Sequence, residues 1–157
     1  MQGLGGRRVL IVEDQAILGM ELEFVLKQAG CQVVGIAIDA RQALTLAAET
    51  RPDLAVVDIN LKDGDDGVAV ARVIAAEFGV TVLFATAEPE LIPEAFAGAC
   101  GVVVKPYSAP SVHEAVAYCL ALRDGLDPGE PPQALRLAPW VAASRRETGG
   151  DDNDGLH

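Results

Sequence analysis

Five residues with charged or hydroxyl side chains stand at the ends of apolar runs in this 157-residue sequence. Glu13 and Asp14 follow the run VLIV, and Asp58 follows LAVV. Thr86 lies at the end of TVLFAT, and Lys105 at the end of GVVVK. Clustered carboxylates repel one another, and a hard divalent cation such as Mg²⁺ offsets that repulsion. An added ammonium and hydroxyl can bind a tetrahedral oxyanion, so these residue types indicate a phosphoryl site.

The apolar runs predict the elements that would bring these side chains together. Uniformly apolar strands alternating with helical patterns indicate an α/β fold with a parallel sheet. We expect a flavodoxin-like, doubly wound, five-stranded sheet of order 2-1-3-4-5 with five helices. All strands then end at one edge, where ligands bind. The predicted strands are 9–12, 31–38, 54–58, 81–87 and 101–105.

Helical patterns fill the segments between the strands. In the first helix the apolar side chains recur at Ala16, Met20 and Phe24. Asp39 is expected to cap the second helix. Pro93 makes the fourth helix weak, so it should be short or irregular. The predicted helices are 15–30, 39–50, 66–79, 90–99 and 108–125, with the last starting near residues 108–111.

Each residue of the predicted site also has an ordinary structural explanation. Glu13, Asp14 and Asp58 are good capping or turn residues, Thr86 suits a turn, and Lys105 suits an exposed strand end. For any one of these residues taken alone, the structural explanation is favoured. All of them together, with complementary chemistry at one edge, favour a functional site.

The segments VLIVEDQ, LAVVDINLKDGDDGV, LFATAEPE and VVVKPYS resemble the receiver domain of two-component response regulators. The resemblance covers about residues 7–123, and FATA further resembles a Phe-Ala-Thr subfamily that is often stand-alone. It implies a receiver domain over residues 1–123. It also implies a signalling domain that assists its own phosphorylation and dephosphorylation, and not an ordinary enzyme.

The resemblance assigns a role to each matching residue. It implies that Asp58 is the phosphoacceptor and that Thr86 and Lys105 bind the phosphate oxygens. It implies that Glu13, Asp14, Asp58 and the backbone carbonyl of Asn60 hold Mg²⁺. The phosphoryl donor would be a histidine of a sensor kinase or of a phosphotransfer protein, and a downstream target protein would receive the signal. The Lys105-Pro106 bond is typically cis in such domains.

Further implications concern the lifetime and the transmission of the signal. Asn60 and Glu88 would flank the path of the attacking water. The usual strand-5 aromatic is replaced by Val102, so the signal would leave by another route, for which Tyr107 is a candidate. The segment 88–96 is expected to be mobile. A homodimer could form through predicted helix 4 (90–99), strand 5 and helix 5 (108–125).

Two other function classes are compatible with parts of the pattern. The Val102 substitution and the weak fourth helix also suit an interaction module with this fold that works without phosphate. An Asp-nucleophile phosphatase usually carries a second Asp two residues later and a cap domain, whereas Asn60 stands at that position here.

Composition limits the partners and the compartment. The net charge of −11 and the pI near 4.4 make direct nucleic-acid or anionic-membrane binding unexpected. A signal-peptide core and a membrane-spanning run were not found, so we expect a cytoplasmic protein. The three cysteines contain no C-x-x-C pair and should be buried free thiols. Residues 124–157 are acidic and rich in Pro and Gly, which predicts a largely disordered tail, with docking around Trp140 as the minor alternative.

Overall fold

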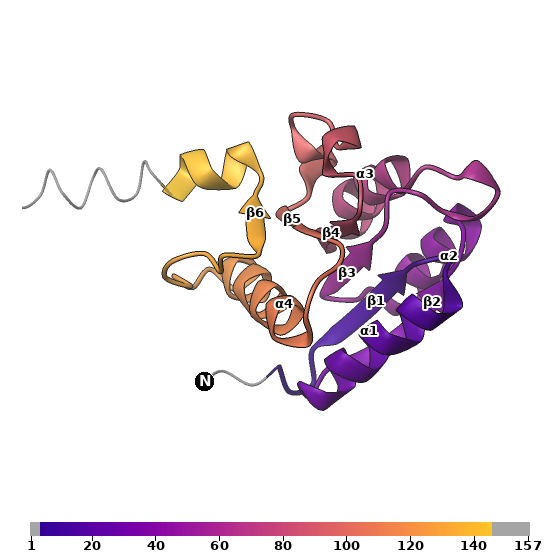
Figure 1. The fold of residues 1–157 in the computed structure, drawn as a ribbon, viewed down its shortest axis with the longest axis horizontal. Helices are drawn as coiled ribbons and strands as arrows, with labels where there is room; N and C mark the ends of the chain where they lie inside the picture. Colours follow the sequence, from indigo (N-terminus) through magenta and orange to yellow (C-terminus); the bar gives the residue numbers. More distant parts are fainter. Residues whose placement is uncertain (1–3, 146–157) are drawn as a thin grey trace, which may run out of the picture.

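A six-stranded sheet lies at the centre of this computed structural model, which describes residues 4–145 (Figure 1). The strand order is β2-β1-β3-β4-β5-β6, and the first five strands are parallel. This confirms the predicted order 2-1-3-4-5 and adds one antiparallel edge strand. The strands are β1 (Arg8–Val12), β2 (Gln32–Ala37), β3 (Leu54–Val57), β4 (Thr81–Thr86), β5 (Gly101–Val104) and β6 (Leu135–Leu137).

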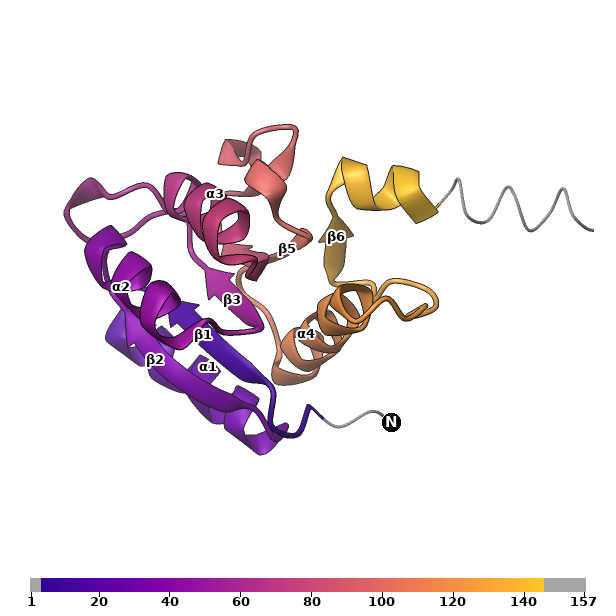
Figure 2. The same cartoon turned by 180° about the vertical axis from the view of Figure 1, so that it is seen from behind.

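Four α-helices cover the two faces of this sheet (Figures 1 and 2). They are α1 (Ala16–Gln28), α2 (Ala40–Thr50), α3 (Gly67–Phe78) and α4 (Ala109–Arg123). One core cluster joins α1 and α4 to one face, and a second joins α2 and α3 to the other. Strand side chains alternate between the two clusters, as in Val9 and Leu10, because successive strand residues point to opposite faces. Both faces are therefore buried, which explains why the strands are apolar throughout.

Side-chain caps fix the starts of three helices. The Asp39 carboxylate accepts a hydrogen bond from the backbone N–H of Gln42 at 2.9 Å and caps α2, as predicted. Ser108 caps α4, which confirms the predicted start. Asp66 caps α3. The N-cap residue of α1 is Gln15 and not Asp14, so the Asp14 carboxylate is not used as the cap.

The exposed face of α1 differs from the predicted one. Gly19, Leu22 and Leu26 are buried against the sheet. The apolar side chains of Met20 and Phe24, which the periodicity placed in the core face, are 63% and 64% exposed. Periodicity alone cannot choose between two apolar stripes on one helix, and the sheet contact decides which stripe is buried.

The predicted fourth helix is replaced by two short 3-10 helices, η2 (Pro89–Leu91) and η3 (Phe96–Gly98). A third, η1 (Lys62–Gly64), follows β3. Pro93 lies between η2 and η3, and Phe96 and Ala97 have positive φ angles of 57° and 49°. A continuous helix is incompatible with these backbone angles, which confirms the expectation that the segment 90–99 is short and irregular.

Part of the predicted tail belongs to the folded structure. Strand β6 pairs with β5 in antiparallel register, and residues 139–145 form a helical segment (Figure 1). The expectation of disorder is therefore corrected for residues 124–145, whereas residues 146–157 lie outside the described residues. Gly101 permits the pairing, because a Cβ there would lie 2.5 Å from the Arg136 carbonyl oxygen. The alternation Leu135-Arg136-Leu137, with Leu135 buried, was the available sequence signal.

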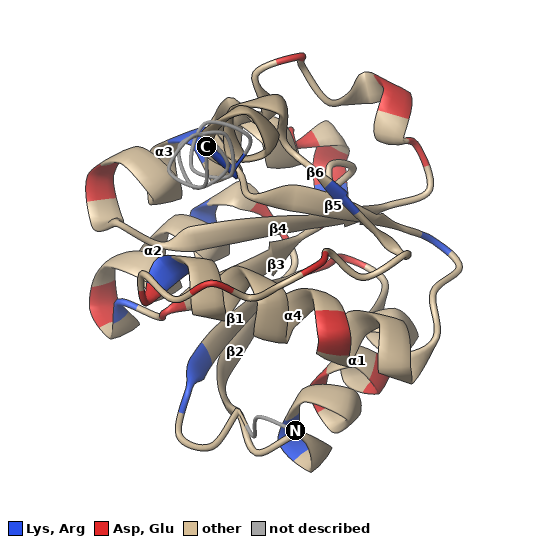
Figure 3. Ribbon diagram, turned by 90° about the vertical axis from the view of Figure 1, so that its left-hand side faces the viewer, with Lys and Arg blue, Asp and Glu red and all other residues tan. Residues whose placement is uncertain are grey.

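Basic residues are dispersed over several of the elements drawn in Figure 3, while acidic residues occupy many helix and loop positions. This distribution agrees with the net charge of −11. Within residues 4–145, every helix falls short of the length and apolarity that a membrane crossing requires.

Candidate functional site

The strand register brings the predicted acidic residues to one edge of the sheet. Val12 of β1 pairs with Val57 of β3, so Glu13 and Asp58 leave the sheet side by side. Thr86 ends β4, and its carbonyl oxygen accepts a hydrogen bond from the backbone N–H of Lys105 at 2.8 Å. Glu13, Asp58 and Thr86 are all buried, with 4%, 7% and 0% of their surface exposed. The sequence therefore places carboxylates, a hydroxyl and an ammonium in one protected region.

Lys105 connects the two buried carboxylates. Its Nζ donates hydrogen bonds to Oε1 of Glu13 at 2.5 Å and to Oδ2 of Asp58 at 2.9 Å. The side chain of Lys105 is only 14% exposed, so these ion pairs are largely removed from water. An ammonium has three N–H donors, and these bonds use two of them.

Burial and hydrogen bonding together set the pKa values of Glu13 and Lys105. Burial raises the pKa of Glu13 above its usual value, and the hydrogen bond from Lys105 offsets part of that rise. Burial by itself would lower the pKa of Lys105, but the hydrogen bonds to Glu13 and Asp58 outweigh it and leave the pKa raised. Lys105 is therefore a permanent cation at neutral pH.

Glu13, Asp14 and Asp58 form an acidic cluster that could hold a metal ion. Each offers a carboxylate oxygen, and the three oxygens lie within 4.8 Å of one another. Lys105 forms ion pairs with two of these carboxylates, Glu13 and Asp58, so one ammonium balances only part of the negative charge of the cluster. Hard carboxylate oxygens are the ligands that Mg²⁺ prefers, and water can fill its remaining positions. The donor set thus fits a hard divalent cation.

Three hydrogen bonds border the acidic cluster. The buried Thr86 Oγ1 accepts a hydrogen bond from the backbone N–H of Glu88 at 3.1 Å, and its hydroxyl hydrogen remains able to donate. The Asn60 side-chain amide donates to Oε1 of Glu88 at 3.1 Å. The backbone N–H of Asn60 donates to Oδ1 of Asp58 at 3.2 Å. The two residues that were expected to flank the path of water are therefore joined to each other beside Asp58.

Gly67 is a residue of the site region that sequence reasoning did not identify. A Cβ at this position would lie 1.9 Å from the Asp58 carbonyl oxygen and 2.7 Å from the Ile59 Cα. Only glycine permits this close approach of α3 to the end of β3. The signal in the sequence was a glycine at the start of a helix, which is not a preferred helical residue.

The side chains considered for signal transmission are packed in the core or partly buried. Val102 is 1% exposed and pairs with Phe84 of β4 on one side and Arg136 of β6 on the other. Tyr107 is partly buried against the α1–α4 core cluster, and burial raises the pKa of its hydroxyl. The Lys105-Pro106 peptide bond is cis, as expected.

This chain is similar in sequence to a known protein family and to several known proteins. The profile of the response regulator receiver domain matches residues 9–117. A relative in Mycobacterium tuberculosis, the transcriptional regulatory protein PdtaR, is 36% identical over 113 residues, which cover 70% of this chain and 55% of PdtaR. The phyllosphere-induced regulator PhyR of Methylorubrum extorquens is 37% identical over 83 residues, which cover 52% of this chain and 31% of PhyR.

A solved structure has the same fold. The solution structure of the Erythrobacter litoralis PhyR response regulator receiver domain superposes with a TM-score of 0.67 at 31% identity. The match covers 74% of this chain and 92% of that structure. The chain spans only about half of PdtaR and about a third of PhyR.

Proposed function

Because this chain belongs to the family of response regulator receiver domains, we propose that it accepts a phosphoryl group on Asp58 and acts by protein–protein contact. The phosphoryl group would come from a histidine of a sensor kinase or of a phosphotransfer protein. The observation that carries the proposal is the position of Asp58, a buried carboxylate bonded to Lys105 and clustered with Glu13 and Asp14.

In the proposed reaction, an Asp58 carboxylate oxygen attacks phosphorus, and the bond from phosphorus to the donor imidazole nitrogen breaks. The chain's residues position the nucleophile and compensate charge, which are the main catalytic effects in phosphoryl transfer. The third N–H of Lys105 and the hydroxyl of Thr86 are suited to bind phosphoryl oxygens. A Mg²⁺ ion held by Glu13, Asp14, Asp58 and the Asn60 carbonyl would neutralise the charge that develops on those oxygens.

The same site would release the phosphate. Water would attack the phosphorus of the acyl phosphate, break its bond to the Asp58 oxygen and regenerate the carboxylate. The linked side chains of Asn60 and Glu88 stand beside Asp58 and would set how easily water enters. We therefore propose that this pair tunes the lifetime of the phosphorylated state.

Incubation with Mg²⁺ and acetyl phosphate, followed by intact-mass measurement, tests the proposal. We expect the wild-type chain to gain one phosphoryl group and Asp58→Asn to gain none. Asp63→Asn is the matched control, since Asp63 is an exposed acid in the same loop and should not alter labelling. An unlabelled wild type, under conditions that label another receiver domain, would contradict the proposal.

The phosphoryl donor is proposed to dock on the exposed apolar row of α1. Ile17, Met20 and Phe24 are each more than 60% exposed and lie on one side of a helix that begins two residues after Asp14. An apolar helix face of this kind suits packing against a partner helix. Met20→Glu should slow phosphotransfer from a histidine donor and leave labelling by acetyl phosphate unchanged. Equal effects on both reactions would place the defect in the site and exclude this docking surface.

We also propose that the domain has a downstream target protein and can form a homodimer. The expected dimer face contains residues 90–99, β5 and α4, and β6 now lies along the outer edge of β5. Light scattering with and without beryllofluoride measures whether a phosphoryl mimic produces a dimer.

We further propose that this signalling occurs in the cytoplasm.

One observation favours a second function, that of an interaction module that does not respond to phosphate. Val102 is fixed between β4 and β6 and cannot change between buried and exposed positions as an aromatic ring can. If a target binds wild type and Asp58→Ala equally, in the presence and absence of beryllofluoride, this second function is the better description.

A further inference from the structure

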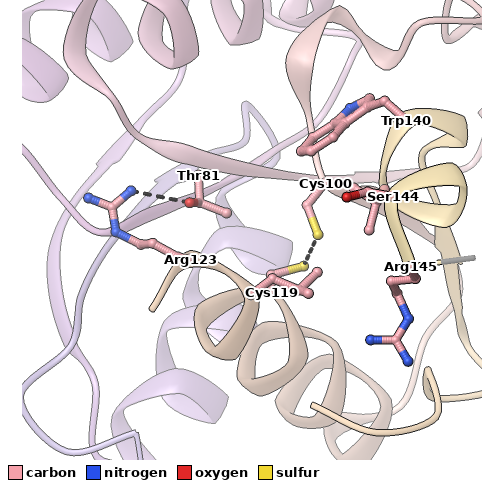
Figure 4. Close-up of a pocket in the computed structure, with 9 residues that line it drawn as sticks. Thr81, Cys100, Cys119, Arg123, Trp140, Ser144 and Arg145 are labelled. Atoms are coloured by element: carbon pink, nitrogen blue, oxygen red, sulfur yellow. Dashed lines mark hydrogen bonds between the residues drawn. The ribbon is translucent and has the colours of Figure 1, made fainter. Parts of the chain in front are cut away.

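Two of the three cysteines lie against each other in the core, away from the acidic cluster (Figure 4). Cys100 stands just before β5, and Cys119 lies in α4, 19 positions later. Their Sγ atoms are 2.9 Å apart, with the Cys119 thiol donating a hydrogen bond to Cys100. Both are buried, as the composition predicted for the cysteines.

Cys100 and Cys119 both line a pocket of about 250 Å³. Figure 4 shows both thiols at its wall, between α4, which carries Cys119, and the helical segment that carries Ser144 and Arg145. The remaining wall includes Leu122, Trp140, Val141 and Arg145. Cys100 is 4% exposed and Cys119 is fully buried, so a small oxidant such as hydrogen peroxide that enters this pocket would meet Cys100 first.

The backbone around Cys100 holds its thiol in place. The N–H of Cys100 donates to the Val82 carbonyl, and its own carbonyl accepts from the N–H of Ala138, both at 2.8 Å. The indole N–H of Trp140 donates to the Ala99 carbonyl at 2.9 Å. The pair is thus clamped between β4, α4 and the segment that follows β6.

We propose that Cys100 and Cys119 are a redox-active thiol pair that a peroxide converts to an intramolecular disulfide. The Cys100 sulfur, as thiolate, attacks one peroxide oxygen, the O–O bond breaks, and water leaves after protonation. Cys100 is then a sulfenic acid. The Cys119 sulfur attacks the Cys100 sulfur, the S–O bond breaks, and a second water leaves with the proton of Cys119. Two thiols and one hydrogen peroxide give one disulfide and two waters.

The order of these steps follows from the hydrogen bond. The pKa of Cys119 is well above its usual value, because of its hydrogen bond to Cys100 and its burial, so Cys119 keeps its proton until the second step. The sulfurs must approach from 2.9 Å to about 2.0 Å to bond, a shift of about 1 Å.

Cys31 is an internal control. It precedes β2 at the opposite edge of the sheet, and burial raises the pKa of its thiol to about 11. A thiol with this pKa is almost entirely protonated near neutral pH and reacts slowly. Cys100 and Cys119 are therefore placed to form a disulfide with each other, whereas Cys31 lies apart from them.

Oxidation would add a covalent bond between two elements of the domain. The disulfide closes a loop that contains β5, Lys105 and the first turns of α4. It would link the start of β5 to α4 while leaving the carboxylates of the acidic cluster unmodified. The proposal does not depend on phosphorylation of Asp58.

The test uses the full chain with Cys31→Ser, reduced and then exposed to excess hydrogen peroxide while dithiothreitol is oxidised in parallel as a reagent control. We expect an intact mass lower by two hydrogen atoms, both thiols protected from iodoacetamide after denaturation, and a peptide that links Cys100 to Cys119. Reduction should restore the starting mass. Two free thiols, addition of oxygen without a crosslink, or a disulfide only between two chains would overturn the proposal.

A second variant separates the two steps. With Cys31→Ser and Cys119→Ser together, peroxide should give a sulfenic acid at Cys100 that dimedone traps, and no intramolecular disulfide. Circular dichroism checks that this variant folds; if it does not, Cys31→Ser with Cys100→Ser takes its place and should give neither a trapped sulfenic acid nor an intramolecular disulfide. Peptide mapping of the Cys31→Ser chain decides the proposal in either case.

Discussion

Replacing Lys105 with methionine should destabilise the metal-free protein strongly, although Lys105 lies at the surface edge of a sheet. The substitution keeps the length of the side chain and removes its ammonium. Glu13 and Asp58 then lose the cation that bonds them at 2.5 and 2.9 Å. Their side chains are only 6% and 8% exposed, so water cannot replace the lost interactions fully.

The expected loss follows from the burial of the pair. Removing one partner of a buried ion pair typically costs about 3–5 kcal/mol, because a charge is left buried without compensation. We therefore expect the free energy of unfolding of Lys105→Met in EDTA to fall by about 3–5 kcal/mol, out of a usual total of about 5–15 kcal/mol. Added Mg²⁺ should restore part of the loss, because it binds the folded acidic cluster in preference to the unfolded chain.

Urea unfolding followed by far-ultraviolet circular dichroism measures this loss. Lys27→Met is the matched control, since Lys27 pairs with Glu23 at 3.4 Å with side chains 60% and 32% exposed. An exposed pair of this type contributes only about 0.3–0.5 kcal/mol. The double variant Asp58→Asn, Lys105→Met should lose less than Lys105→Met alone, because one of the uncompensated charges is gone.

Two results would refute this reasoning. If Lys105→Met loses no more stability in EDTA than Lys27→Met, the buried ion pairs do not contribute as their geometry indicates. If Mg²⁺ stabilises neither the wild type nor Lys105→Met, the acidic cluster does not hold a divalent ion under these conditions.

Three further substitutions test other parts of the structure. Burial raises the folded-state pKa of Glu13 above its unfolded value of 4.5. In EDTA, Glu13 therefore contributes most to the free energy of unfolding below pH 4.5, and this contribution is lost as the pH rises through the folded-state pKa. Urea curves across this range should show that component in the wild type and not in Glu13→Gln. Gly67→Ala should lower the free energy of unfolding by about 1–3 kcal/mol and weaken acetyl phosphate labelling, because its Cβ would overlap the Asp58 backbone; normal stability and labelling would refute this. Gly101→Ala should displace β6, seen as hydrogen exchange at the Ala138 amide at least about tenfold faster, with labelling of Asp58 retained; unchanged exchange would show that β6 tolerates a side chain there.

The sequence was informative about the site because parallel strands leave little freedom at their ends. Once VLIV and LAVV are neighbouring parallel strands, Glu13 and Asp58 must emerge side by side. The same reasoning placed Thr86 next to Lys105. Sequence patterns also located the cap Asp39 and the approximate start of α4, because capping depends on a side chain and the nearest backbone N–H groups.

The sequence was less informative where several arrangements satisfy the same local pattern. The helix α1 carries two apolar stripes, and only contact with the sheet decided that Met20 and Phe24 remain exposed. The short strand β6 has three residues in a Pro-rich and Gly-rich segment, which is too weak a pattern to identify alone. It is stabilised by pairing with β5 across a glycine, a contact between distant parts of the chain.

The sequence by itself determined the order of elements and the chemistry at the strand ends, because hydrophobic periodicity, caps and turns act over a few residues. Only the tertiary structure decided that Lys105 bonds both buried carboxylates, that Asn60 meets Glu88, and that Cys100 lies against Cys119. These contacts depend on side-chain positions set by packing between elements far apart in the chain, and no local pattern encodes an atomic distance of that kind.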